Sequence, residues 1–123
     1  MPIVDNHAHL DIARHGQEGM PVAAALAAAK AVGVDRTVQV ACDLESIAAL
    51  PALLDAHPSV LGAAALHPND AARLGARGQL AAAYEAVEAA LADPRVRAVG
   101  ETGLDYFRTD EVGRPAQEES FRW

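Results

Sequence analysis

The chain has 123 residues, of which 51% are hydrophobic, 22% charged and 4% aromatic, and its formal net charge is −7. This composition predicts one globular domain, and the acidic balance argues against an extended basic footprint for double-stranded DNA. No apolar run approaches the ~18 residues of a membrane span, and no secretory signal is visible. The single cysteine, Cys42, fits a reducing compartment, so a cytoplasmic location is expected.

Short apolar runs alternate with longer stretches of helical composition along the chain. Each apolar run is bounded by turn residues and predicts a strand. The predicted strands cover Ile3–Leu10, Thr37–Asp43, Val60–Pro68 and Val96–Leu104. The predicted helices cover about Val22–Val32, Leu44–Ala56 and Gly78–Ala92, with a fourth beginning near Pro115. Strands that alternate with helices in this way indicate an α/β fold with a parallel sheet.

Individual residues predict details of these elements. Gly33 is placed as the C′ glycine that ends the first helix. Pro51 lies inside the second helix and is expected to kink or split it. The fourth strand is left as a hydrophobic edge, and the helix near Pro115 has no room to finish before Trp123. We therefore expect the sequence to be a partial one.

The segment Asp5-Asn6-His7-Ala8-His9 carries the first candidate site residues. Alternate residues of a strand share a face, so Asp5, His7 and His9 are expected to point the same way near the end of the first strand. Two neutral imidazoles can hold one divalent metal, and α/β active sites lie at the C-terminal ends of parallel strands. The alternative is a pair of polar residues at a strand end with no metal.

Glu101 is the second candidate, within Gly100-Glu101-Thr102-Gly103-Leu104-Asp105-Tyr106. Val96–Gly100 is expected to be a buried apolar run, and Val99 and Glu101 to share one face of the fourth strand. A carboxylate in that setting is costly unless a cation neutralises it, which predicts a metal or an arginine beside Glu101. The alternative is a salt-bridged surface glutamate.

Three further histidines, one aspartate and the cysteine are weaker candidates. His67, at the end of the third predicted strand, is placed to contact a substrate oxyanion or to carry a proton, with an ordinary loop histidine as the alternative. Asp105 is expected to form hydrogen bonds at the site or to shape a turn. His15 and His57 are expected on the surface. Cys42 is interpreted as a small buried hydrophobe rather than a nucleophile.

Three segments together resemble the TatD family of metal-dependent hydrolases. They are Val4–Asp11 with its His-x-His pair, Ala65–Pro68, and Val99–Tyr106, and the resemblance runs over Ile3–Trp123. It implies the first four βα units of a (β/α)8 TIM-type barrel, covering residues 1–123 and lacking the second half. Four strands cannot close such a barrel, so the chain alone is expected to be catalytically inactive and poorly folded.

The resemblance also implies a site and a reaction. His7 and His9 match ligands to one metal, Glu101 matches a carboxylate that bridges two divalent ions, and His67 matches a substrate-contacting histidine. The implied reaction is hydrolysis of phosphodiester bonds in DNA by a metal-activated water, with Glu101 and His67 as catalytic residues and His67 and Asp105 at the substrate. Magnesium, manganese and zinc all remain open as the metal.

Other functions remain open from the sequence. One is a different His-x-His barrel hydrolase acting on cyclic amides or small esters. Such enzymes usually bridge their metals with a lysine on the fourth strand, whereas the only lysine here, Lys30, lies in the first predicted helix. A small phosphodiester or a D-aminoacyl ester is an alternative substrate. Another alternative is a non-catalytic half-barrel that pairs with a second half.

Overall fold

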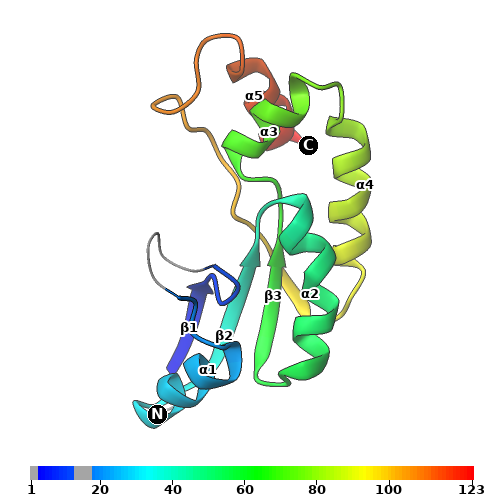
Figure 1. The fold of residues 1–123 in the computed structure, drawn as a ribbon. Coiled ribbons are helices and arrows are strands. Elements are labelled where there is room, and N and C mark those ends of the chain that lie inside the picture. Colours follow the sequence, from blue (N-terminus) through cyan, green and yellow to red (C-terminus); the bar gives the residue numbers. More distant parts are fainter. Residues whose placement is uncertain (1–2, 13–17) are drawn as a thin grey trace.

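The computed structural model describes residues 3–12 and 18–123 (Figure 1). The expectation placed on His15 lies outside these residues. The strands are β1 (Ile3–Ala8), β2 (Val34–Ala41), β3 (Val60–Ala64) and β4 (Val96–Val99). The helices are α1 (Val22–Ala31), α2 (Leu44–Ala56), α3 (Pro68–Gly75), α4 (Leu80–Leu91) and α5 (Arg114–Arg122).

The four strands form one sheet in the order β1-β2-β3-β4, and every neighbouring pair is parallel. This confirms the predicted α/β fold with a parallel sheet. Because parallel strands all run the same way, their C-terminal ends meet along one edge of the sheet. The segments that follow β1, β3 and β4 therefore start from the same end of the molecule.

The hydrophobic core lies between the middle strands and the helices α2 and α4, which pack against each other (Figure 1). Its side chains include Ile47, Leu50, Leu54, Val60 and Val87. Helix α1 begins at Val22 and buries none of its residues. Helices α3 and α5 pack together beyond the C-terminal ends of the strands (Figure 1).

Helix α2 corrects one part of the expectation for Pro51, namely that this residue would split the helix. The helix is continuous from Leu44 to Ala56, so it is not split. Pro51 lies on the exposed side, while Ile47, Leu50 and Leu54 are buried on the other. The apolar contacts of these three residues stabilise both halves of the helix, although Pro51 cannot donate a backbone hydrogen bond.

Residues at the helix ends form the capping interactions expected from their types. Asp43 caps α2, because its carboxylate accepts a hydrogen bond from the Ser46 backbone at 2.7 Å and Ser46 returns one, completing a capping box. Gly33 takes φ +92° after α1, and its N–H donates to the Lys30 carbonyl. This confirms Gly33 as the predicted C′ glycine.

Helix α3 was not expected from the sequence. The predicted third strand runs to Pro68, but β3 ends at Ala64 and α3 begins at Pro68. Proline is favoured at the first position of a helix, and Asp70 in the first turn complements the helix dipole. These two residues were the available signal for this short helix.

The two edge strands are more exposed than expected. Val99 is 64% exposed and Val96 only half-buried, so Val96–Gly100 is not a buried run. Ile3 and Val4 on β1 are 51% and 52% exposed. The reason is position, because β1 and β4 each have a strand on one side only. Within the described ranges, no helix combines the length and apolar character needed to cross a membrane.

Candidate metal centre

His7 and His9 converge at the end of β1. His7 lies in the strand and His9 follows it directly, and their ring centroids are 5.2 Å apart. The carboxylate of Asp5 instead accepts a hydrogen bond from the backbone N–H of His7 at 3.1 Å. The predicted pairing of the two imidazoles is therefore present, whereas Asp5 is not part of their cluster.

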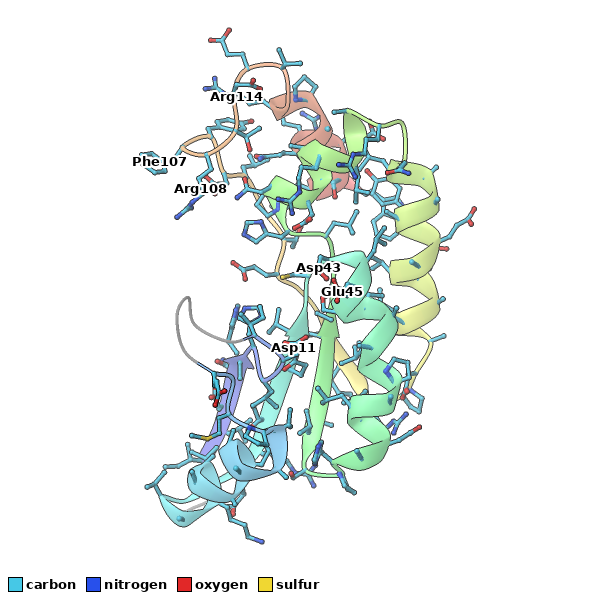
Figure 2. All side chains as sticks on the ribbon, viewed as in Figure 1. Asp11, Asp43, Glu45, Phe107, Arg108 and Arg114 are labelled. Carbon is cyan, nitrogen blue, oxygen red and sulfur yellow. The ribbon has the colours of Figure 1, made fainter. Side chains whose placement is uncertain are left out.

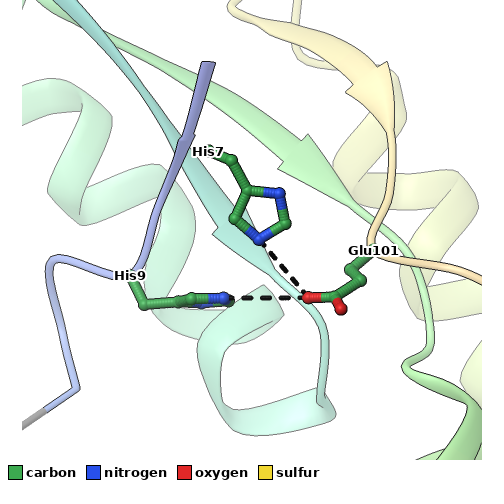
Figure 3. A group of neighbouring side chains, drawn as sticks. All are labelled: His7, His9 and Glu101. Atoms are coloured by element: carbon green, nitrogen blue, oxygen red, sulfur yellow. Dashed lines mark ion pairs between the residues drawn. The ribbon is translucent and has the colours of Figure 1, made fainter. Parts of the chain in front are cut away.

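Glu101 completes this cluster from the other edge of the sheet (Figure 3). Its Oε2 atom lies 3.4 Å from Nε2 of His7 and 3.8 Å from Nε2 of His9. Three strand spacings of ~4.8 Å would separate β1 and β4 by roughly 14 Å in a flat sheet. The His7 and Glu101 side chains therefore reach toward each other across this width.

The sequence predicts Glu101 on the fourth strand, but the structure places it in the loop that follows β4. The strand ends at Val99, and the last contact with β3 is the hydrogen bond from the Gly100 N–H to the Ala64 carbonyl. Beyond it the chain leaves the sheet, and Gly103 takes φ +144°, a conformation that side chains disfavour. The Glu101 side chain is 39% exposed, so a partly exposed loop glutamate rather than a buried strand residue faces the histidines.

The hydrogen bonds of His9 prepare it to bind a metal. Its Nδ1 atom lies 3.1 Å from the backbone oxygen of Val40 on β2. A carbonyl can only accept, so Nδ1 carries the hydrogen and the lone pair of neutral His9 is on Nε2. Nε2 is the atom that faces Glu101. A backbone carbonyl that orients a histidine in this way is typical of metal ligands.

These residues fit a divalent cation. The ligand atoms of His7, His9 and Glu101 all lie within 4.8 Å of one another. Two imidazole nitrogens and a carboxylate oxygen form a donor set that zinc and manganese accept. A cation among them would also neutralise Glu101, which has no lysine or arginine partner among the ion pairs of the described residues.

His67 faces the same carboxylate from α3, with its Nε2 atom 3.9 Å from Oε1 of Glu101. It is the N-cap of this helix, and its Nδ1 atom accepts a hydrogen bond from the Asn69 backbone N–H at 3.1 Å. Since Nδ1 accepts, neutral His67 carries its hydrogen on Nε2. His67 therefore presents a donor to the site, whereas His9 presents a lone pair.

Asp105 is occupied by protein donors. Its Oδ2 atom accepts hydrogen bonds from Asn69 at 3.1 Å and from Arg108 at 2.9 Å, and its Oδ1 accepts from the Arg108 backbone. The hydrogen bonds from Arg108 hold the pKa of Asp105 below its ordinary value. A substrate contact by Asp105 stays a prediction, because these contacts do not test it.

Gln39 was missed in the sequence. It is 1% exposed on β2, where its Oε1 accepts from the Leu10 N–H and its Nε2 donates to Asp11, both at 2.7 Å. These bonds hold the chain that leaves His9. A glutamine inside an apolar strand run was the signal, because a buried amide must be hydrogen-bonded.

Neither Cys42 nor His57 is among the residues whose ligand atoms gather in the cluster. Cys42 is half-buried, and burial together with the nearby Asp43 raises the pKa of its thiol to about 11. It therefore stays protonated near neutral pH, as expected for a residue that is not a nucleophile. His57 is half-buried at the end of α2, next to the N-terminal end of β3. This is the end of the sheet opposite the His7 cluster.

The model of the family described as "TatD related DNase" matches residues 4–123. An uncharacterized metal-dependent hydrolase TatD of Mycobacterium tuberculosis is 39% identical over 127 residues, covering 98% of this chain and 45% of that protein. The chain thus spans less than half the length of this curated relative.

A solved structure supports the same conclusion for the fold. The crystal structure of a TatD family hydrolase from Entamoeba histolytica superposes with a TM-score of 0.76 at 20% sequence identity. The match covers 98% of this chain and 44% of that one. It confirms the predicted four βα units of a TIM-type barrel. Together with the match over residues 4–123, this shows that the chain belongs to the TatD family of metal-dependent hydrolases.

Proposed function

We propose that this chain contributes four strands and the first metal ligands to a phosphodiester hydrolase that acts on DNA. The observation that carries the proposal is the convergence of His7, His9 and Glu101 from two edges of the sheet, with His67 beside them. Because the chain spans 45% of its mycobacterial relative, the activity is proposed for the complete barrel.

We propose two divalent ions at this site, with Glu101 shared between them. The Oε2 atom of Glu101 faces His7 and His9, whereas its Oε1 atom faces His67. Divalent ions bound there supply Lewis acidity toward a phosphoryl oxygen and lower the pKa of water. Magnesium, manganese and zinc are all candidates, because imidazole and carboxylate ligands suit them to differing degrees.

The protein residues have separate tasks in this proposal. His7 and His9 hold the first ion through Nε2, and the Val40 carbonyl fixes the orientation of the His9 ring. His67 donates from Nε2 to an oxygen of the substrate phosphate, since its Nδ1 is already engaged by Asn69. Phosphate oxygens are strong acceptors, and the cations offset the repulsion expected from a chain of net charge −7.

The function is tested on the full-length protein, after chelator treatment and reloading with Mn²⁺. We expect cleavage of a fluorescent single-stranded oligonucleotide, and of bis(p-nitrophenyl) phosphate as a small diester. EDTA should abolish it, and so should Glu101→Gln, which retains shape but loses charge. A protein that hydrolyses only a cyclic amide or a carboxylic ester would refute the DNA substrate, and activity unaffected by EDTA would refute the metal.

The cellular location is also a proposal. The given sequence has one cysteine and so can form no disulfide within itself, which suits a reducing compartment, so we propose the cytoplasm. Fractionation of cells that express the tagged full-length protein would test this, and recovery outside the cytoplasmic fraction would contradict it.

A further inference from the structure

The loop between β4 and α5, residues 100–113, carries Glu101 but has few apolar anchors. Leu104, Phe107 and Val112 are 46%, 93% and 86% exposed. Figure 2 shows Phe107 and Arg108 projecting outward from this loop. Hydrophobic burial therefore does little to hold Glu101 in place, and polar contacts must do it.

Gln117 of α5 supplies one set of these contacts. It is fully buried, its Oε1 accepts from the Asp105 N–H at 2.8 Å, and its Nε2 donates to the Thr109 hydroxyl at 2.7 Å. A buried amide costs free energy unless its donors and acceptors are paired. Both ends of this side chain are paired with the loop.

Asn69 of α3 supplies the other set. Its Nδ2 donates to Oδ2 of Asp105 at 3.1 Å, and its Oδ1 accepts from the Thr109 hydroxyl at 3.0 Å. Asn69, Asp105, Thr109 and Gln117 thus form a closed ring of hydrogen bonds, which we name the Asn69 ring. The backbone N–H of Asn69 is also the group that holds the His67 imidazole.

The Asn69 ring therefore joins the segments that carry two site residues. Glu101 lies four residues before Asp105, and His67 lies two residues before Asn69. Their atoms Oε1 and Nε2 are 3.9 Å apart, although they come from different elements. Breaking the ring would free the loop to move relative to α3, and Glu101 would move with it.

We propose that Asn69, Thr109 and Gln117 are positioning residues that hold Glu101 against His7, His9 and His67. The inference rests on the proposed metal site but not on the identity of the substrate. It also assigns Asp105 a place in the scaffold of the site, through Asn69, Gln117 and Arg108.

Thr109→Val and Thr109→Ser test the proposal in the full-length protein. Valine keeps the shape and removes the hydroxyl from the ring, whereas serine keeps the hydroxyl. Residues that hydrogen-bond a metal ligand typically contribute about 10-fold to 100-fold in metal affinity, and Thr109, which acts on Glu101 through the loop, is expected at the low end of this range. We expect Thr109→Val to weaken Mn²⁺ affinity about tenfold, measured by competition with a chelating dye. Thr109→Ser should keep the wild-type Mn²⁺ affinity, and Asn69→Ala should lose as much of this affinity as Thr109→Val.

Arg95→Ala is the matched control. Arg95 pairs with Asp55 at 2.6 Å and Asp93 at 2.7 Å at the N-terminal end of β4, at the other end of the sheet from the Asn69 ring. It should lower the melting temperature and leave Mn²⁺ affinity unchanged. Wild-type Mn²⁺ affinity in both Thr109→Val and Asn69→Ala would overturn the proposal. The proposal would also be overturned if Arg95→Ala lost Mn²⁺ affinity in proportion to its loss of stability, because the effect would then not be specific to the Asn69 ring.

The readout separates this inference from the proposed function. Manganese affinity is measured without substrate, so an inactive wild-type protein that binds Mn²⁺ would refute the DNA substrate and leave the ring testable. Electron paramagnetic resonance of bound Mn²⁺ gives a second readout. The spectrum should change in Thr109→Val, return in Thr109→Ser and stay unchanged in Arg95→Ala; an unchanged spectrum in Thr109→Val would count against a positioning role.

Discussion

His9 and His67 both direct Nε2 at the carboxylate of Glu101, but their rings carry the hydrogen on opposite nitrogens. Nδ1 of His9 donates to the Val40 carbonyl, and Nδ1 of His67 accepts from the Asn69 N–H. The two neutral side chains therefore offer different chemistry at nearly equal distances of 3.8 and 3.9 Å. One offers a lone pair for a metal, and the other offers a hydrogen-bond donor.

Substitution of His67 should separate its two tasks. His67→Ala removes both the N-cap of α3 and the donor, so we expect a loss of about 1 kcal/mol in unfolding free energy and a large loss of turnover. His67→Asn keeps a good N-cap and removes the imidazole, so stability should stay near wild type while turnover falls. Urea unfolding and diester hydrolysis measure the two effects. Wild-type turnover in His67→Asn would contradict the donor role.

Substitution of Glu101 should remove bound metal. Glu101→Ala loses the ligand shared by the proposed ions, and we expect the metal content to fall at both positions, measured by elemental analysis after gel filtration. Glu101→Gln should lose most of the metal too, because the amide keeps the shape without the charge. His57→Ala is the control and should bind and turn over like wild type, since His57 lies at the opposite end of the sheet. Full metal content in Glu101→Ala would exclude the ligand role.

The packing of α3 on α5 predicts that a glycine-to-alanine substitution, which usually stabilises a helix, destabilises this protein. Replacing a helical glycine with alanine usually stabilises a helix by about 1 kcal/mol. At Gly75, however, a new Cβ would overlap the Cβ of Ala116 on α5. We expect Gly75→Ala to destabilise the protein. The double variant with Ala116→Gly, which moves the methyl group across the interface, should recover part of the loss. A more stable single variant in urea unfolding would show that the helices separate easily.

Asp93 gives a pH prediction. Hydrogen bonds from Arg95 lower its pKa from an ordinary 3.8 to about 2 in the folded protein. A depressed folded-state pKa contributes stability above the unfolded value, and this contribution is lost as pH falls through the folded value. The stability advantage of wild type over Asp93→Asn should therefore be constant above about pH 5 and shrink between pH 4 and 2. Urea midpoints across this range measure it, and a constant difference down to pH 2 would contradict the shift.

Much of the fold was predictable because its signals are local. Alternating apolar and helical stretches indicated the parallel α/β sheet, and Gly33 marked the end of α1. The sequence pattern does not separate the short helix α3 from the strand before it, because the predicted strand runs to Pro68, which is the first residue of that helix. The split expected at Pro51 is absent, because the buried face of α2 outweighs one missing hydrogen bond.

The sequence by itself determined which residue types were available for a metal, namely His7 and His9 two positions apart and Glu101 between small residues. Only the tertiary structure decided that Glu101 meets both histidines, which nitrogen of each ring carries the hydrogen, and that Gln39 and Gln117 hold the surrounding chain. The physical reason is that most of these properties depend on contacts between residues far apart in the chain, whereas the N–H that sets the state of His67 belongs to Asn69, two residues away. The His7 and Glu101 side chains meet across the sheet, and the carbonyl of Val40 on β2 sets which nitrogen of His9 carries the hydrogen.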